Sequence, residues 1–156
     1  MDLPDRRRRE TPLRRPRDGR EMKHLLPAAE KGDADAQFNV AVLLHSRMDE
    51  NGYPAPGNRA EAIKWLRLAA QQGLARAQLK LAEIYVEGPD APHHYIKASS
   101  WFLLAIGSSK GAHRQAAQSG YDRITALMTP AQIAKAKGLA AAWKPRRPKP
   151  AEAAAA

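Results

Sequence analysis

The chain has 156 residues and a mass of 17.1 kDa, the size of a single modest domain. Hydrophobic residues make up 44% and charged residues 27% of the chain, so its composition is that of a folded protein rather than a wholly disordered one. The formal net charge is +10 at pH 7, and the absence of cysteine excludes disulfides, thiolate metal sites and cysteine nucleophiles.

The first element in chain order is a basic tail, and a second basic tail ends the chain. Residues 1–24 carry nine Lys and Arg against five Asp and Glu, and residues 143–156 carry four against one. Both segments are rich in proline and lack the spaced apolar residues that could offset the entropy of ordering. We therefore predict disordered tails at 1–20 and 144–156. They either bind nucleic acid or an anionic membrane surface, or serve only as solubilising extensions.

An internal repeat follows the first tail. Residues 28–37 align with residues 69–78 at an offset of 41, and the small and large apolar residues of 40–44 match those of 81–85. Gly32 and Gly73 stand where a left-handed residue would end a helix. Proline at position 27 requires the first helix to start late or to kink, because proline lacks the backbone N–H of a helix interior.

The second helix of each pair repeats at a different offset. Residues 62–70 match residues 98–106 at an offset of 36, and both segments place apolar residues on one face of a helix. The difference corresponds to five extra residues in the first internal loop, which a stack of repeats tolerates. Asn58 to Glu61 fits a capping box, and the breaker residues Pro54, Pro56, Gly57, Gly88, Pro89 and Pro92 separate the paired helices.

Two further helices end the predicted domain. An apolar stripe runs through 116–127, and Thr129 to Gln132 forms a capping box with proline in the first turn of a last helix. The buried edge of this helix is Ile133, Ala136, Ala140 and Trp143. We expect this pair to cap the array. The sequence thus predicts an all-α fold over residues 21–143, an α-solenoid of antiparallel helix pairs, since short helix pairs bury their apolar faces only by stacking on neighbours.

The repeat resembles the Sel1-like repeats, which are relatives of the tetratricopeptide repeats. The resembling pattern is carried by Ala69–Gln78, Leu81–Tyr85 and Lys97–Trp101, and the resemblance covers about residues 25–143. It assigns structural roles within the repeat to Ala41, Trp65, Ala69, Gly73, Ala82, Tyr85 and Trp101.

The resemblance implies a non-catalytic scaffold that binds an unidentified protein partner, frequently in bacterial signalling, envelope or secretion settings. By analogy with the related repeats, the binding groove is lined by Asp35, Phe38, Val42, His45 and Ser46 in one unit and by Arg76, Leu79, Glu83, Val86 and Glu87 in the next. The apolar members suggest a bound peptide or helix. Alternatively, these apolar residues belong to the core or to contacts between repeats.

Catalytic and metal-binding patterns are absent from the sequence. His93 and His94 are adjacent and have no third ligand at a suitable spacing, and no serine stands in a nucleophile motif. We therefore predict no enzyme activity, no cofactor and no small-molecule substrate. The longest apolar run, Trp101–Ile106, has six residues where a membrane span needs about twenty, and no secretion signal is formed at the start, so we expect a cytoplasmic location.

Overall fold

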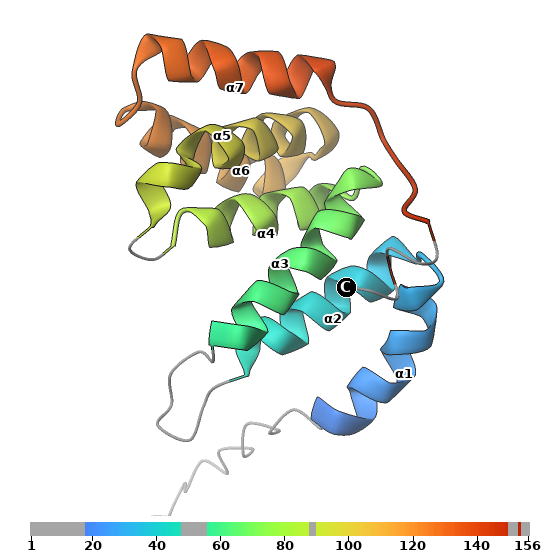
Figure 1. Ribbon diagram of the computed structural model, residues 1–156. Helices are drawn as coiled ribbons and strands as arrows, with labels where there is room; N and C mark the ends of the chain where they lie inside the picture. The colour runs from blue at the N-terminus through green and yellow to red at the C-terminus, as the bar shows by residue number, and fades with distance from the viewer. Residues whose placement is uncertain (1–17, 48–55, 88–89, 150–152, 154–156) are drawn as a thin grey trace, which may run out of the picture.

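Figure 1 shows the stacked helices of the computed structural model, which describes residues 18–47, 56–87, 90–149 and 153. Within these residues the regular structure is helical and no strand occurs, which confirms the predicted all-α class. The predicted breakers Pro54, Gly88 and Pro89 and residues 1–17 lie outside the described residues. The helices are α1 (Asp18–Glu30), α2 (Ala34–Ser46), α3 (Pro56–Gln71), α4 (Ala75–Tyr85), α5 (Ala91–Ser108), α6 (Gly111–Thr125) and α7 (Pro130–Ala142).

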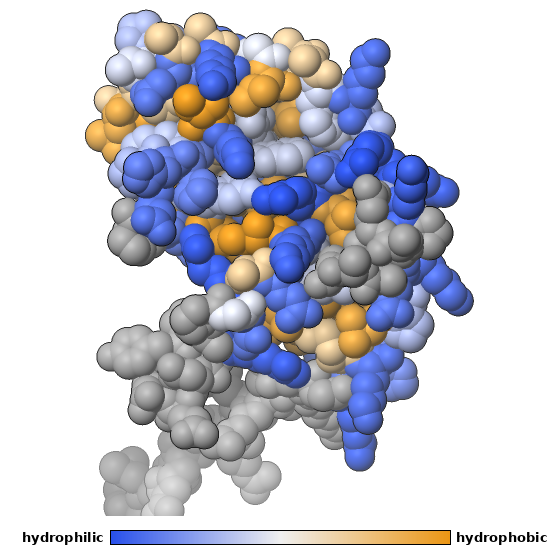
Figure 2. Space-filling model, viewed as in Figure 1, coloured by the Kyte–Doolittle hydropathy of each residue, from blue (hydrophilic) through white to orange (hydrophobic). Residues whose placement is uncertain are grey.

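The helices pack on one another in chain order. α2 packs against α3 and α4 packs against α5, and these are the two predicted helix pairs. The α3–α4 contact joins the pairs, while α1 covers α2 at one end of the stack. The result is the predicted array of helical repeats, in which each pair buries its apolar face against its neighbours. On the side seen in Figure 2, hydrophilic residues cover most of the described surface and apolar residues form separate patches between them.

Glycines end the helices that precede α2 and α4. Gly32 and Gly73 have φ angles of 102° and 94°, the left-handed region that glycine adopts without strain. After Gly32, the backbone N–H of Asp33 donates to the carbonyl of Ala28 at 3.1 Å, and the equivalent bond after Gly73 measures 3.4 Å. The predicted helix ends are confirmed, and each allows the chain to turn at once into the next helix.

Two buried glutamines join each repeat to the helix before it. The side-chain amide of Gln37 donates to the carbonyl oxygen of Ala29 at 3.1 Å, and that of Gln78 donates to Ala70 at 3.2 Å. Both side chains are almost fully buried. Each bond gives a second donor to a carbonyl in the last turn of α1 or α3, which also accepts from the backbone N–H of Gly32 or Gly73. This explains the recurrence of Ala-Gln in the repeat.

The same glutamines also accept hydrogen bonds from the end of the second helix of their own pair. Gln72 donates to the side-chain oxygen of Gln37 at 3.0 Å, and Ser108 donates to that of Gln78 at 3.0 Å. Gln72 and Ser108 are themselves 36 residues apart, so they occupy one position in successive units. The side chains therefore form a short polar ladder through an otherwise apolar core, and every member has a partner, as buried polar groups require.

The residues with predicted structural roles lie where helices meet. Alanines in this set allow close approach between helix backbones, while the aromatic members fill wider gaps. Trp101 is partly buried and packs against the core. Buried members of the set are Ala41, Trp65, Ala69, Ala82 and Tyr85, and Gly73 forms the turn described above.

The last two helices are arranged differently from the pairs before them. α6 and α7 both pack against α5, and α7 does not lie against α6 as α3 lies against α2. Gly120 lets the backbone of α6 rest on the ring of Phe102, since a Cβ atom at Gly120 would lie 2.5 Å from that ring. The expectation of a third helix pair is therefore wrong, because α6 and α7 cover α5 as two separate helices.

The segment after α7 turns back along the stack (Figure 1). In Arg146, the backbone N–H donates to the carbonyl of Gln71 at 2.7 Å, and the guanidinium bonds the side chain of Gln71 at 3.2 Å. The ring of Trp143 lies beside Gly73. Residues 144–149, which the sequence predicts to be disordered, are thus described as an extended segment bonded to the end of α3.

Two predicted helix starts need correction. α3 begins at Pro56, so Asn58 lies within its first turn and is not the capping residue; proline suits this first position because its missing N–H would have no partner there. α1 begins at Asp18 and runs through Pro27, so the prediction of a late start is wrong. The capping box of Thr129 and Gln132 is confirmed by reciprocal bonds of 2.9 and 3.2 Å.

Candidate functional site

α2, α4 and the two residues after α4 carry the predicted groove residues, and their side chains meet at both ends of these helices. At the start of α2 and α4, Arg76 forms an ion pair with Asp35 and lies 4.8 Å above the centre of the Phe38 ring. Leu79 is 7% exposed and belongs to the core. These four predicted groove residues therefore contact one another or the interior of the protein.

At the other end of α2, the predicted residues also make internal contacts. The imidazole of His45 lies 3.8 Å from the carboxylate of Glu87, and the Ser46 hydroxyl donates to the carbonyl of Leu43 at 2.9 Å. Burial lowers the pKa of His45 below its ordinary value of 6.5, with Lys80 adding to the effect. The neutral imidazole is therefore favoured. Val42, at 38% exposed, is the most open apolar residue of this part.

The end of α4 is tied to α3 by Arg59. Its guanidinium donates to the carbonyl of Ile84 at 2.9 Å and to that of Glu87 at 3.1 Å. Both acceptors lie in the last turn of α4 or just after it, where helix carbonyls lack partners within the helix. Arg59 thereby fixes the backbone that carries Val86 and Glu87 toward α6.

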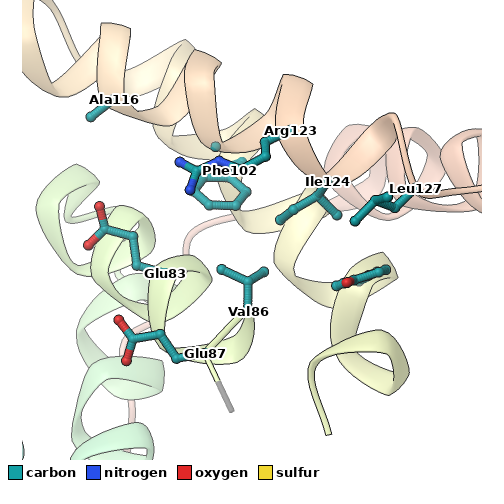
Figure 3. Close-up of a pocket in the computed structure, with 10 residues that line it drawn as sticks. Glu83, Val86, Glu87, Phe102, Ala116, Arg123, Ile124 and Leu127 are labelled. Atoms are coloured by element: carbon teal, nitrogen blue, oxygen red, sulfur yellow. The ribbon is translucent and has the colours of Figure 1, made fainter. Parts of the chain in front are cut away.

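A pocket of about 390 Å³ opens between α4, α5 and α6 (Figure 3). Its floor is Phe102, which is almost fully buried, and Ile124 is buried beside it. Leu127, just after α6, is 69% exposed at the pocket, and Arg123 approaches from α6. The residues that line the pocket are Glu83, Val86, Glu87, Tyr95, Phe102, Ala116, Gly120, Arg123, Ile124 and Leu127.

Glu83 is the half-buried carboxylate of this pocket. Burial raises its pKa above the ordinary value of 4.5, and Glu87 adds to the rise, whereas Lys80, Arg123 and His113 act in the opposite direction. Among the described residues, no hydrogen bond or ion pair reaches the Glu83 side chain. Burial therefore removes part of the hydration of the charged carboxylate, and no partner among the described residues offsets this loss.

The sequence placed three of these pocket residues in the groove and missed the others. Glu83, Val86 and Glu87 belong to the predicted set, while the residues of the α6 wall belong only to the predicted apolar stripe over 116–127. Ala116 and Leu127 of that stripe are exposed. The available signal was the 36-residue offset, which places 111–125 one unit after α4 and so beside it on the same face.

The described residues contain neither a metal-binding cluster nor a membrane-spanning helix. In the described part of the chain, no three His, Asp or Glu side chains are grouped so that they could hold a metal ion. His94 stacks on Tyr85 with ring centres 5.2 Å apart. A search of the described residues for membrane-spanning helices found none of sufficient length and apolarity.

Paired helices that repeat their turns, buried glutamines and small core residues define an α-helical repeat protein. The Sel1 repeat family model matches residues 34–74 and 75–106, which are α2 with α3 and α4 with most of α5. The chain thus carries two Sel1 repeats over residues 34–106. Sel1 repeats are generally protein-interaction modules and are typically non-catalytic. Searches of curated proteins and of solved structures found no match.

The match to the Sel1 family model ends at residue 106, and the ladder of glutamine and serine side chains is not continued in α6. At the 36-residue offset, the position of Gln78 is taken by Arg114, which is exposed and cannot serve as the buried link to the preceding helix. α7 then packs on α5 instead of pairing with α6. α6 is therefore a helix added to the face of two Sel1 repeats, and it supplies one wall of the pocket.

Proposed function

We propose that this protein is a non-catalytic scaffold that holds a segment of a partner protein on the face carried by α2, α4 and α6. The pocket between α4, α5 and α6 is the observation that supports this function most directly, because it joins an exposed apolar residue, Leu127, to a recess with a buried aromatic floor. Of the predicted groove residues, Glu83, Val86 and Glu87 form the part that a partner would enter.

The remaining predicted groove residues have a different role in this proposal. Asp35, Phe38 and Arg76 contact one another, and Leu79 is in the core, so they support the face without offering an open recess. Val42 and Ser46 are exposed at its edge and would extend the contact area. Binding energy should concentrate at the pocket, since a few residues seated in a recess usually dominate an interface.

A photo-crosslinking experiment tests this function in the native host. A photoreactive amino acid replaces Leu127 at the pocket or, as the matched control, Leu139, an exposed leucine of α7 that does not line it. We expect a discrete adduct from position 127 that disappears when Val86→Arg fills the recess. Circular dichroism checks that this variant stays folded. Equal adducts from both positions, or an adduct that persists in Val86→Arg, would contradict the proposal.

The alternative function, binding of nucleic acid or an anionic surface by the basic tails, stays a prediction. In the C-terminal segment, Arg146 already bonds Gln71, and Lys149 has an interaction within the protein as well. Binding through the tails would fall steeply with salt, because released counterions drive such contacts. A flat response of binding to salt would exclude it.

A further inference from the structure

The pocket beside α6 has two chemically different ends. In Figure 3 the carboxylates of Glu83 and Glu87 lie at one end, Ile124 and Leu127 lie at the other, and Val86 stands between them. Glu83, Val86 and Glu87 share one face at the end of α4, because residues three or four apart on a helix are neighbours, whereas Ile124 and Leu127 come from the end of α6. An occupant that fills the whole pocket must therefore present an apolar group and a polar group side by side.

The acidic end lacks a cation at contact distance. Glu83 is half-buried and has no ion pair or hydrogen bond among the described residues, although the charges of Lys80, Arg123 and His113 are near enough to influence it. Among the residues that the structure describes, the ion-pair partner of the Glu87 carboxylate is the His45 imidazole, at 3.8 Å and favoured in its neutral form. A cation brought by a partner would form ion pairs with both carboxylates and would offset the desolvation of Glu83.

The apolar end lacks a cover. Leu127 is 69% exposed although it stands beside the buried Ile124, and Val86 is partly exposed on the opposite wall. Covering apolar surface of this kind contributes about 25 cal/mol per Å². A single bulky aliphatic or aromatic side chain placed between Val86 and Leu127 would bury both.

We infer that the occupant of this pocket is a partner segment in which a bulky apolar residue stands close to a lysine or arginine, with the apolar side chain between Val86 and Leu127 and the cation at Glu83 and Glu87. This inference rests on the proposed scaffold function and adds the chemistry of the bound segment. The lysine or arginine distinguishes this segment from a purely hydrophobic one. Its contribution to affinity can be measured through its pairing with Glu83.

The probe is a displayed library of randomised linear peptides, selected on the full chain. One selected peptide is then synthesised with its Lys or Arg intact and with that residue replaced by glutamine. Affinities of both peptides are measured for the parent protein, for Glu83→Gln and for the control Glu61→Gln, an exposed glutamate of α3 away from the pocket. Leu127→Ala and its control Leu139→Ala test the apolar end in the same way.

We expect Glu83→Gln to weaken the intact peptide about tenfold and to leave the glutamine peptide unchanged, which is the signature of a direct pair. Glu61→Gln and Leu139→Ala should change neither affinity, while Leu127→Ala should weaken both peptides. Loss of affinity in Leu127→Ala without any coupling to Glu83 would overturn the inference and leave the scaffold function standing.

Two other results would bear on the proposed function or on the identity of the occupant. If no peptide binds, or if neither Leu127→Ala nor Val86→Arg affects any selected peptide, the proposed function fails together with the inference. If the full chain self-associates and Leu127→Ala abolishes this, the occupant is a second copy of the chain rather than a partner. Sedimentation of the parent and the variant over a range of concentrations measures that outcome.

Discussion

The two junctions along the binding face, α2 with α4 and α4 with α6, differ in how their side chains meet. At the first, Arg76 reaches Asp35, which occupies the same position one repeat earlier. At the second, the 36-residue offset places Ala112 opposite Arg76, and alanine is too short to make such a contact. Further along α6, the small residues Ala116 and Gly120 line the pocket that remains. One repeat architecture therefore gives a closed junction or an open one according to side-chain length.

The largest effect should come from the floor of the open junction. Phe102→Ala removes an almost fully buried ring between α5 and α6, and we expect the free energy of unfolding to fall by about 3–5 kcal/mol. Urea denaturation measures the loss. Phe102→Leu introduces the residue type that stands at the equivalent position of the preceding repeat, Leu66, and should lower the free energy of unfolding much less. Equal losses in the two variants would mean that ring volume does not hold this junction together.

A glycine pair tests how closely α6 approaches α5. Gly120→Ala places a methyl group against Phe102, so we expect a loss of about 1–3 kcal/mol in unfolding free energy from overpacking. The control is Gly138→Ala in α7, where a Cβ atom meets nothing within 4 Å. That change should stabilise the protein by up to about 1 kcal/mol, since alanine favours helix interiors. Thermal unfolding of both variants separates crowding from helix propensity, and stabilisation by Gly120→Ala would contradict the close contact.

The closed junction should contribute little to stability. Asp35→Asn breaks an ion pair whose side chains are both well exposed, and it should lower the free energy of unfolding by less than about 1 kcal/mol. Arg76→Ala also removes the contact with Phe38, which adds a loss of similar size. A double-mutant cycle in low and high salt isolates the ion-pair energy. A coupling well above this range would show that the junction is more strongly coupled than its exposure indicates.

The smallest effect is a difference in pH response between the two junctions. The folded-state pKa of His45 is lowered, so its contribution is complete above pH 6.5 and is lost as the pH falls through the folded value. The folded-state pKa of Glu83 is raised, so its contribution is complete below pH 4.5 and is lost as the pH rises through the folded value. Both groups retain contact with solvent, so each effect should stay below about 1 kcal/mol.

Stability against pH, measured for the parent and for single variants, separates these responses. Glu83→Gln should gain stability relative to the parent as the pH rises from about 4 to 7, while His45→Gln should lose its disadvantage as the pH falls below about 6. Parallel curves for parent and variant at either site would show that the group keeps its ordinary pKa in the folded protein.

Much of the fold could be predicted from the sequence because the repeat supplies the same local signals twice. Gly32 and Gly73 end helices in the left-handed conformation, and apolar positions at helical spacing become buried in α3 and α5. The last pair could not be predicted in this way. Its apolar stripe is compatible with pairing to any neighbour, and only packing reveals that α6 and α7 both cover α5.

The binding face was only partly predictable for a related reason. Helical spacing places Phe38, Leu79 and Glu83 on one face of their helices, but spacing does not say how far a neighbouring side chain extends. Arg76 covers Phe38, Leu79 packs into the core, and Glu83 stays beside an open pocket. The residues of α6 that complete the pocket have the same apolar character as core residues, so composition alone could not separate them.

The sequence by itself determined the helices, their turns and the repeat, because these depend on backbone conformation and on periodic burial within one or two successive units. Only the tertiary structure decided which surface is open. A pocket exists where the side chains of two packed helices are too short to meet, and that depends on their relative placement in space. The carboxylate of Glu83 lies beside an open pocket for this reason, whereas the charge of Arg76 is already paired within its own chain.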